Sequence, residues 1–221
     1  MTRIGLVTIG QAPREDIEAA MFPGGPPVPC HYAGALDGLD EDAIATLAPR
    51  DGEVPLVTRL RDGQEVVVAK ESVLPLLARA VERVVATGAR VVVVLCTGEF
   101  PGLTAPVPLV FPDRVLRATV DALLPDGVLG VLMPHPGQGP MMKRKWAAPG
   151  RSLRCAAASP YTGAAELRAC AEELHAAGAQ LIVMDCMGYT AAMKQAVTAA
   201  GVPTILANRL VGRVVEEIVT A

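Results

Sequence analysis

Two cysteines that follow similar apolar runs are the residues of this 221-residue sequence best suited to chemistry. Cys96 and Cys186 each precede a glycine by two residues, Gly98 and Gly188, and a glycine lets the backbone turn with its N–H groups pointing outward. Such N–H groups hold a carboxylate and lower the pKa of a nearby thiol, which makes a thiolate available as a base. Two thiols on opposite faces of one carbon invert it without a cofactor, because one removes a proton while the other delivers one.

Packing is the competing interpretation of these cysteines, because a buried cysteine is a common small core residue. Their equivalent positions in a repeat favour a shared active-site role instead. The other three cysteines have no such support. We expect Cys170 to pack within a helix, and Cys30 and Cys155 to be ordinary strand residues.

The chain contains an internal repeat. Residues 86–98 (ATGARVVVVLCTG) align without gaps on residues 176–188 (AAGAQLIVMDCMG), with six identities in thirteen positions. A second block aligns residues 107–120 on residues 202–215, and a weaker similarity sets residues 5–7 against residues 130–132. Each half therefore contributes a parallel strand that ends in a Cys-x-Gly turn. Ligands bind beyond the carboxyl ends of such strands, so both turns should open onto one shared cleft.

Short β-branched runs alternate with segments of helical spacing, which is typical of an α/β fold. Expected strands cover residues 4–9, 91–95, 107–111, 128–133, 153–158, 181–185 and 204–207. Expected helices cover residues 72–86, 114–124, 164–177, 191–200 and 209–219. These elements predict two similar doubly wound parallel-sheet lobes related by a pseudo-twofold axis.

We expect residues 1–112 with about 208–221 to form the first lobe and residues 113–207 the second, in a single compact unit with the site between them. The runs 54–60 and 65–69 flank Asp62-Gly63, which predicts an inserted, protruding β-hairpin. Whether residues 54–69 form a lid stays open. The proline-rich stretch 23–29 predicts a stiff loop, or equally a lid.

The composition limits the classes of partner that this chain is expected to bind. Aromatic residues make up 3% of the chain and the net charge is −3, so neither base stacking nor phosphate neutralisation is favoured, and no nucleic-acid partner is expected. No apolar run approaches the length of a membrane helix, and the N-terminus lacks a signal-peptide pattern, so we expect a soluble cytoplasmic protein with reduced thiols. No metal-ligand spacing accompanies the three histidines, which predicts no metal and no cofactor. A homodimer is a further expectation.

Three segments, IGLVTIGQAPRED, VVVVLCTGEFPGLTA and LIVMDCMGYT, resemble the AroM family within the aspartate/glutamate (hydantoin) racemase superfamily. The resemblance covers nearly the whole chain. It implies two doubly wound α/β lobes with a site between them and cofactor-independent racemisation by a cysteine pair. Related members include hydantoin racemases, maleate isomerases and arylmalonate decarboxylases.

The sequence departs from the racemase pattern beside both cysteines. Amino-acid racemases usually have Cys-Asn-Thr and Gly-Cys-Thr, whereas this chain has Cys96-Thr97-Gly98 and Asp185-Cys186-Met187. The asparagine amide is missing, so ordinary aspartate or glutamate is not the expected substrate. Thr97 and Thr190 keep hydroxyl groups near the cysteines, and Asp185 would orient a polar group while opposing thiolate formation.

The segment Gly10-Gln11-Ala12-Pro13-Arg14 follows the first strand and opens a helix, where α/β proteins often bind anions. Gln11 would hydrogen-bond the substrate and Arg14 would clamp a carboxylate, unless Arg14 is only a solvated helix residue. The candidate substrate-binding residues are Gly10, Gln11, Arg14, Thr97, Gly98, Gly188, Tyr189 and Thr190.

Several other residues have simpler interpretations. We expect Arg114 to be a packing residue and Asn208 to cap its helix, while Arg209 contacts a ligand or packs. His135 is a candidate to reach the cleft. The basic cluster 143–146 (KRKW) predicts a solvated helix face with one aromatic anchor.

The first functional hypothesis is a cofactor-independent racemase, epimerase or related isomerase of a small carboxylate-bearing molecule, with Cys96 and Cys186 as the acid/base pair. A second keeps the fold but uses one cysteine, in isomerisation or in protonation after decarboxylation. A third is a non-catalytic protein that binds a small ligand, with unreactive thiols of ordinary or raised pKa.

Overall fold

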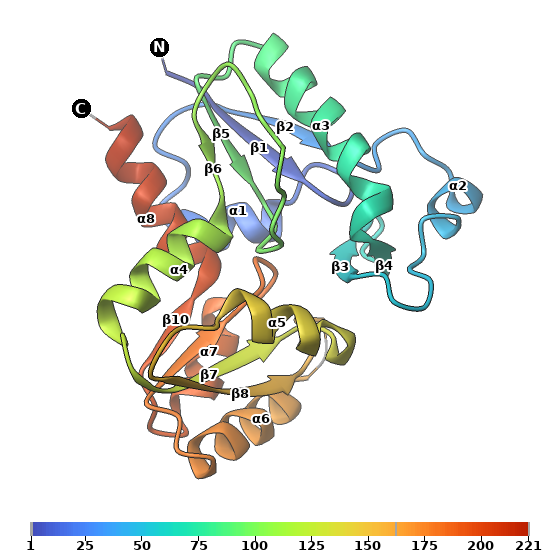
Figure 1. Ribbon diagram of the computed structural model, residues 1–221. Helices are drawn as coiled ribbons and strands as arrows, with labels where there is room; N and C mark the ends of the chain where they lie inside the picture. The colour runs from blue at the N-terminus through green and yellow to red at the C-terminus, as the bar shows by residue number, and fades with distance from the viewer. Residues whose placement is uncertain (1, 162, 221) are drawn as a thin grey trace.

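The computed structural model describes residues 2–161 and 163–220, in which two parallel four-stranded sheets form two stacked lobes (Figure 1). The first sheet has the order β2-β1-β5-β6, with strands β1 (Ile4–Thr8), β2 (Cys30–Gly34), β5 (Val91–Val94) and β6 (Leu109–Val110). The second has the order β10-β9-β7-β8, with strands β7 (Gly127–Met133), β8 (Arg151–Ala157), β9 (Leu181–Met184) and β10 (Thr204–Leu206). When the strands of each sheet are numbered by their order in the chain, both sheets have the same spatial order of second, first, third and fourth strand. The predicted pair of similar α/β lobes is confirmed.

Helices cover both sheets (Figure 1). The first lobe carries α1 (Glu15–Met21), α2 (Glu41–Ala45) and α3 (Lys70–Ala86). The second carries the 3-10 helix η1 (Pro136–Gln138), α5 (Gly139–Lys145), α6 (Ala164–Ala176) and α7 (Ala191–Thr198). The helices α4 (Pro112–Leu123) and α8 (Ala207–Val219) follow the last strand of each sheet and pack against each other. The sequence did not predict α2, and of α5 it indicated only the helix face at residues 143–146.

The packing of two glycines repeats between the lobes. Gly5 in β1 and Gly130 in β7 both lie where an added Cβ would press on side chains of the following helix and strand. The neighbours of the two glycines correspond one to one with an offset of 90 residues. They are Val84, Ala89 and Val92 around Gly5, and Leu174, Ala179 and Ile182 around Gly130. The weak similarity between the two opening strands therefore reflects a shared packing solution.

A continuous apolar core joins the lobes. Its buried members include Val93 from the first sheet, Val131 and Val183 from the second, and Val211 from α8. The helix α8 leaves the second sheet and packs on α1, where Arg209 Nη1 donates a hydrogen bond to the Met21 carbonyl oxygen at 2.9 Å. The predicted lobe boundaries, with the assignment of this C-terminal helix to the first lobe, stay a prediction. Within the described residues, no helix has both the length and the apolar character needed to span a membrane.

The predicted hairpin is confirmed as β3 (Pro55–Arg59) paired antiparallel with β4 (Glu65–Ala69). Gly63 in its turn has a φ of +94°, a conformation that glycine adopts without a Cβ penalty. The hairpin lies beside the junction of the lobes (Figure 1). Gln138 Nε2 of the second lobe donates to the Pro55 carbonyl oxygen at 2.9 Å, and the Ser159 hydroxyl donates to the Glu65 carboxylate.

Candidate functional site

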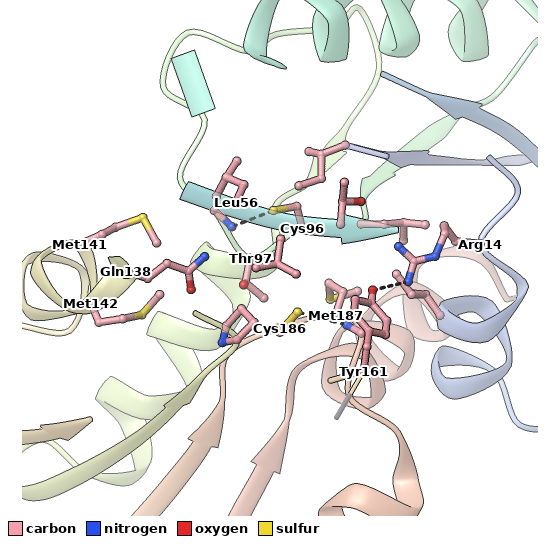
Figure 2. A pocket seen from close by; sticks show the side chains of 18 residues that line it. Arg14, Leu56, Cys96, Thr97, Gln138, Met141, Met142, Tyr161, Cys186 and Met187 are labelled. Carbon is pink, nitrogen blue, oxygen red and sulfur yellow. Dashed lines mark hydrogen bonds between the residues drawn. The ribbon is translucent and has the colours of Figure 1, made fainter. Parts of the chain in front are cut away.

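The two repeat cysteines line one cavity between the lobes (Figure 2). Cys96 follows β5 of the first lobe and Cys186 follows β9 of the second. Both strands are fully buried apolar runs that end where the sheets face each other, so each delivers its cysteine to the same space. The predicted juxtaposition of these two side chains is therefore observed.

The two thiols have matching backbone partners. The Gly98 N–H donates to Cys96 Sγ at 3.3 Å, and the Gly188 N–H donates to Cys186 Sγ at 3.4 Å. These hydrogen bonds favour the thiolate, as does a nearby cation. The repeat has thus preserved the local support of each sulfur as well as its position.

The sequence-based expectation that these thiols have lowered pKa values is wrong. Burial raises the pKa of Cys96 to about 12, against the opposing effects of the Gly98 N–H and Lys145. Burial likewise raises the pKa of Cys186 to about 11, against the Gly188 N–H and the charge of Arg14. The desolvation of a charged sulfur outweighs a single hydrogen bond, so both thiols are protonated at neutral pH in the closed, ligand-free protein.

Arg14 is a buried residue of the cavity wall and not a solvated helix residue, since it is 6% exposed. Its Nε and Nη2 atoms donate to the Asp16 carboxylate at 2.8 and 2.7 Å, and Nη2 also donates to the Tyr161 hydroxyl at 2.9 Å (Figure 2). Burial opposes ionisation of Asp16, but the bonds and charge of Arg14 hold the pKa of that carboxyl below its usual value. Among the described residues Nη1 has no hydrogen-bond partner.

Tyr161 belongs to the site although the sequence did not point to it. Its hydroxyl joins the second lobe to Arg14, and the Arg59 guanidinium of the hairpin lies 5.2 Å from the centre of its ring. Burial raises the pKa of Tyr161, so the hydroxyl is a neutral hydrogen-bonding group at neutral pH. Three separate segments of the chain meet at this ring.

Thr58 and Gln138 are two further lining residues that the sequence did not indicate. Thr58 stands on β3 and Gln138 ends η1. Both side chains are buried, and neither Thr58 Oγ1 nor Gln138 Oε1 has a hydrogen-bond partner among the described residues. Met141, Met142 and the hairpin residue Leu56 add apolar surface to the same cavity (Figure 2).

The basic cluster 143–146 is not a solvated face throughout, which corrects the expectation. Lys143 and Arg144 are exposed, but Lys145 and Trp146 are buried, each one helical turn beyond a buried methionine. The Lys145 ammonium donates to both oxygens of Asp185 and to the Thr97 carbonyl oxygen, each at 2.8 Å. The Trp146 indole N–H donates to the same carboxylate at 2.9 Å.

This buried ion pair lies directly behind the cysteines. Thr97 follows Cys96 and Asp185 precedes Cys186, and the Thr97 hydroxyl also donates to the Asp185 carbonyl oxygen at 3.1 Å. Lys145 therefore ties the two cysteine turns together. The expectation that Asp185 orients a polar group and opposes thiolate formation agrees with these contacts and with its effect on both thiols.

Four of the predicted substrate-binding residues, Arg14, Thr97, Gly98 and Gly188, line the cavity. The other four lie outside its wall and have structural partners. Gly10 lets the hairpin backbone approach, Gln11 Oε1 accepts from the Arg61 N–H at 2.9 Å, and the buried Tyr189 hydroxyl donates to a carbonyl beyond β8 at 2.6 Å. Thr190 caps the N-terminus of α7.

Asn208 does not cap its helix, which corrects another expectation. The helix α8 begins at Ala207, and its N-cap residue is Leu206. Asn208 is buried, and its amide donates to the carbonyl oxygens of Met187 at 2.9 Å and Tyr189 at 2.6 Å. It holds the backbone turn that follows Cys186.

The remaining candidates lie outside the cavity lining. Arg114 is exposed and stacks on Phe111 at 4.3 Å, in agreement with a packing role, and Arg209 bonds the backbone of α1. His135 lines a separate surface groove beside the hairpin and accepts a hydrogen bond from its own turn at 3.0 Å. It does not reach the cysteines' cavity.

The cavity is closed in this structure. Its volume open to water is about 20 Å³, which is enough for one water molecule. The lining combines two thiols, one guanidinium, a phenol, two hydroxyls and an amide with apolar side chains. Such a set can hold a small anion and transfer protons, provided that the site opens to admit it.

Comparison with known proteins agrees with this architecture. Residues 4–219 match the family model described as AroM protein. Among solved structures, allantoin racemase from Klebsiella pneumoniae matches with a TM-score of 0.65 at 17% identity, over 99% of this chain and 88% of that one. Unliganded arylmalonate decarboxylase matches with a TM-score of 0.62 at 14% identity, over 99% of this chain and 92% of that one.

Glutamate racemase from Francisella tularensis, in complex with D-glutamate, matches with a TM-score of 0.59 at 12% identity, over 98% of this chain and 80% of that one. No curated protein matches the sequence significantly. At these identities the solved structures establish a shared fold.

Proposed function

This chain belongs to the AroM family, and from its site we propose that it is a cofactor-independent racemase, epimerase or related isomerase of a small carboxylate-bearing substrate. Cys96 and Cys186 are the acid/base pair. One observation carries the proposal: the two cysteines of a repeated motif enter one cavity from opposite lobes, each with its sulfur held by the N–H of a following glycine.

The proposed reaction transfers two protons at one carbon. One cysteine, as a thiolate, takes the proton from the carbon next to the carboxylate, and the electron pair moves into the carboxylate group. The other cysteine, as a thiol, donates its proton to the opposite face, so the stereocentre is inverted and the two sulfurs exchange protonation states. Arg14 Nη1 stabilises the negative charge that gathers on the carboxylate.

The raised thiol pKa values suit the difficulty of this step. A proton on carbon beside a carboxylate is weakly acidic, and a buried thiolate of high pKa is a stronger base than an exposed one. The reactive thiolate is scarce, however, since at pH 7 a thiol of pKa about 11 is ionised in roughly one molecule in ten thousand. The rate should therefore rise with pH.

We propose that the β3–β4 hairpin is the lid. It contributes Leu56 and Thr58 to the cavity wall, and it touches the second lobe through Pro55 and Glu65. Among the described residues, two hydrogen bonds and the contact of Arg59 with the Tyr161 ring join it to the second lobe, whereas a continuous apolar core joins the two lobes. Its movement would admit substrate while leaving both cysteine turns in place.

A reaction that uses one cysteine is the second candidate. It is favoured by the raised pKa of both thiols, because a protonated thiol is suited to donate a proton to the carbanion left by decarboxylation. The fold shared with arylmalonate decarboxylase accords with this candidate. It predicts that only one of the two cysteines is essential.

Deuterium incorporation at carbon in D₂O, measured by NMR across small carboxylates, tests the proposal. Cys96→Ser and Cys186→Ser are compared with wild type, and Cys170→Ser on α6 is the matched control, because its sulfur contacts the Ala157 carbonyl instead of the cavity. Loss of exchange in both site variants supports the two-base reaction. Loss in one supports the second candidate, and exchange unaffected by either variant refutes both.

A further inference from the structure

Two buried polar atoms in the cavity wall lack hydrogen-bond partners among the described residues. Thr58 is 2% exposed and Gln138 is 4% exposed, yet Thr58 Oγ1 and Gln138 Oε1 contact no donor or acceptor. A buried polar atom without a partner costs free energy of folding, so such atoms are rare unless they have another use. Both residues line the cavity that holds the cysteines, and Thr58 Oγ1 lies in the wall against Gly10.

The amide of Gln138 has a defined orientation. Its Nε2 donates to the Pro55 carbonyl oxygen at 2.9 Å, which only the NH₂ side of the amide can do. The oxygen Oε1 is therefore the free atom, and it is an acceptor. Figure 2 shows this amide between the methionines of α5 and Thr97.

The charge of the cavity restricts the donor that would meet this oxygen. No carboxylate is among the described lining residues, and Arg14 is a cation in the wall. An ammonium group would meet no carboxylate in the described lining, only the transient cysteine thiolate, and would lose the large hydration energy of an ion. A neutral hydroxyl or amide N–H needs no counter-charge and loses less hydration.

We infer that the substrate carries, beside its carboxylate, a neutral O–H or N–H donor that Gln138 Oε1 accepts, with the Thr58 hydroxyl bonding a second polar atom. This inference rests on the proposed function and defines its substrate class. The class comprises 2-hydroxy acids and N-acylated 2-amino acids. It excludes free amino acids and acids that carry only hydrocarbon substituents.

Stability of the ligand-free protein gives the first test. Thr58→Val removes an unpartnered hydroxyl with little change in volume, so the melting temperature should stay equal or rise. Thr8→Val is the matched control, because the Thr8 hydroxyl is equally buried but accepts a hydrogen bond from the Gly10 N–H at 3.1 Å, and its loss should lower the melting temperature. A fall in the Thr58→Val protein as large as that of the control would overturn the assignment of a free hydroxyl.

Ligand binding gives the second test and needs no turnover. Lactate and N-acetylalanine are compared with 2-methoxypropionate and alanine, through the protection of Cys96 and Cys186 from alkylation, followed by mass spectrometry. Lactate and N-acetylalanine should protect at concentrations at least about tenfold lower than the other two. Gln138→Met should reduce this preference to within about twofold.

The outcomes separate the inference from the proposed function. Equal protection by methoxypropionate, stronger protection by alanine, or no protection by either donor-bearing probe at tens of millimolar overturns the inference. If the donor preference is found but no probe exchanges deuterium, the inference holds and the proposed reaction fails for these probes. If exchange depends on the cysteines but not on the donor, the reaction holds and the inference fails.

Discussion

Replacing Lys145 with methionine should destabilise the protein strongly, because it leaves the Asp185 carboxylate buried without its cation. Both side chains are 0% exposed, and the nitrogen lies 2.8 Å from the oxygen. At that distance and an effective dielectric constant of about 20, the attraction is about 6 kcal/mol, and the desolvation of the two ions offsets most of it. Removal of one partner loses the attraction but keeps the other ion desolvated, so we expect a loss of about 3–5 kcal/mol in unfolding free energy.

The assay is urea denaturation of Lys145→Met, Asp185→Asn and the double variant, with Lys143→Met on the exposed face of α5 as the matched control. The double variant should lose at least about 2 kcal/mol less than the sum of the two single losses. A single-variant loss below about 1 kcal/mol, or additive losses, would refute a buried ion pair at this position.

Three further outcomes are expected. Burial raises the pKa of Cys96 and Cys186 above the unfolded value of 9.0, so the unfolded chain loses these protons at lower pH than the folded protein does. The unfolding free energy should therefore fall between about pH 9 and 11, by up to about 1.4 kcal/mol per pH unit for each thiol. Denaturation measured against pH should show a shallower fall for a Cys96→Ala/Cys186→Ala protein. Arg14→Lys should lower kcat/KM for carboxylate substrates by roughly a hundredfold, since an ammonium cannot bind Asp16 and a substrate with the same planar geometry; an unchanged KM in steady-state kinetics would contradict carboxylate binding. Gly212→Ala should cost about 2–3 kcal/mol in chemical denaturation, because its Cβ would overlap the backbone of α1. Gly139→Ala should be neutral or stabilising, because its Cβ would meet only the Met133 methyl group at ordinary contact distance.

The repeat made the fold predictable from the sequence. Each Cys-x-Gly motif follows a buried strand. The two copies of the motif therefore predicted that β5 and β9 are equivalent strands and that both thiols lie beyond their carboxyl ends. The burial of Lys145 in the short helix α5 was missed, because its charge and those of its neighbours suggested exposure to solvent. The partner of Lys145 is Asp185, forty residues further along the chain, and no local pattern reveals a pairing over that separation.

The residues of the site likewise divide into those that the sequence indicated and those that it did not. Cys96, Cys186 and Arg14 follow strands or open a helix, so pattern and position indicated them. Thr58 and Gln138 come from the inserted hairpin and from a loop outside the repeat, and only the folded chain brings them to the cavity. A free polar atom is a property of three-dimensional packing, which composition and spacing do not encode.

The duplicated supports behind the cysteines have diverged, and this divergence gives the thiols different surroundings. Asn208 in α8 holds the Met187 carbonyl beyond Cys186, whereas at the equivalent place beyond Cys96 the Thr97 carbonyl is held by Lys145. The position in α4 that corresponds to Asn208 is Asp113.

Burial raises the pKa of Asp113 although Lys145 opposes this, a shift toward the uncharged form, which resembles the carboxamide at the equivalent position. One oxygen of each, Asp113 Oδ1 and Asn208 Oδ1, lacks a hydrogen-bond partner among the described residues. The charge of Arg14 opposes the effect of burial on the pKa of Cys186, and the charge of Lys145 opposes it on the pKa of Cys96. Each thiol therefore has its own cation, and each cation is bound to its own aspartate. A substrate carboxylate that binds Arg14 would change the charge near Cys186 more than the charge near Cys96. The two cysteines are therefore equivalent in position but not in the way substrate binding alters their acidity.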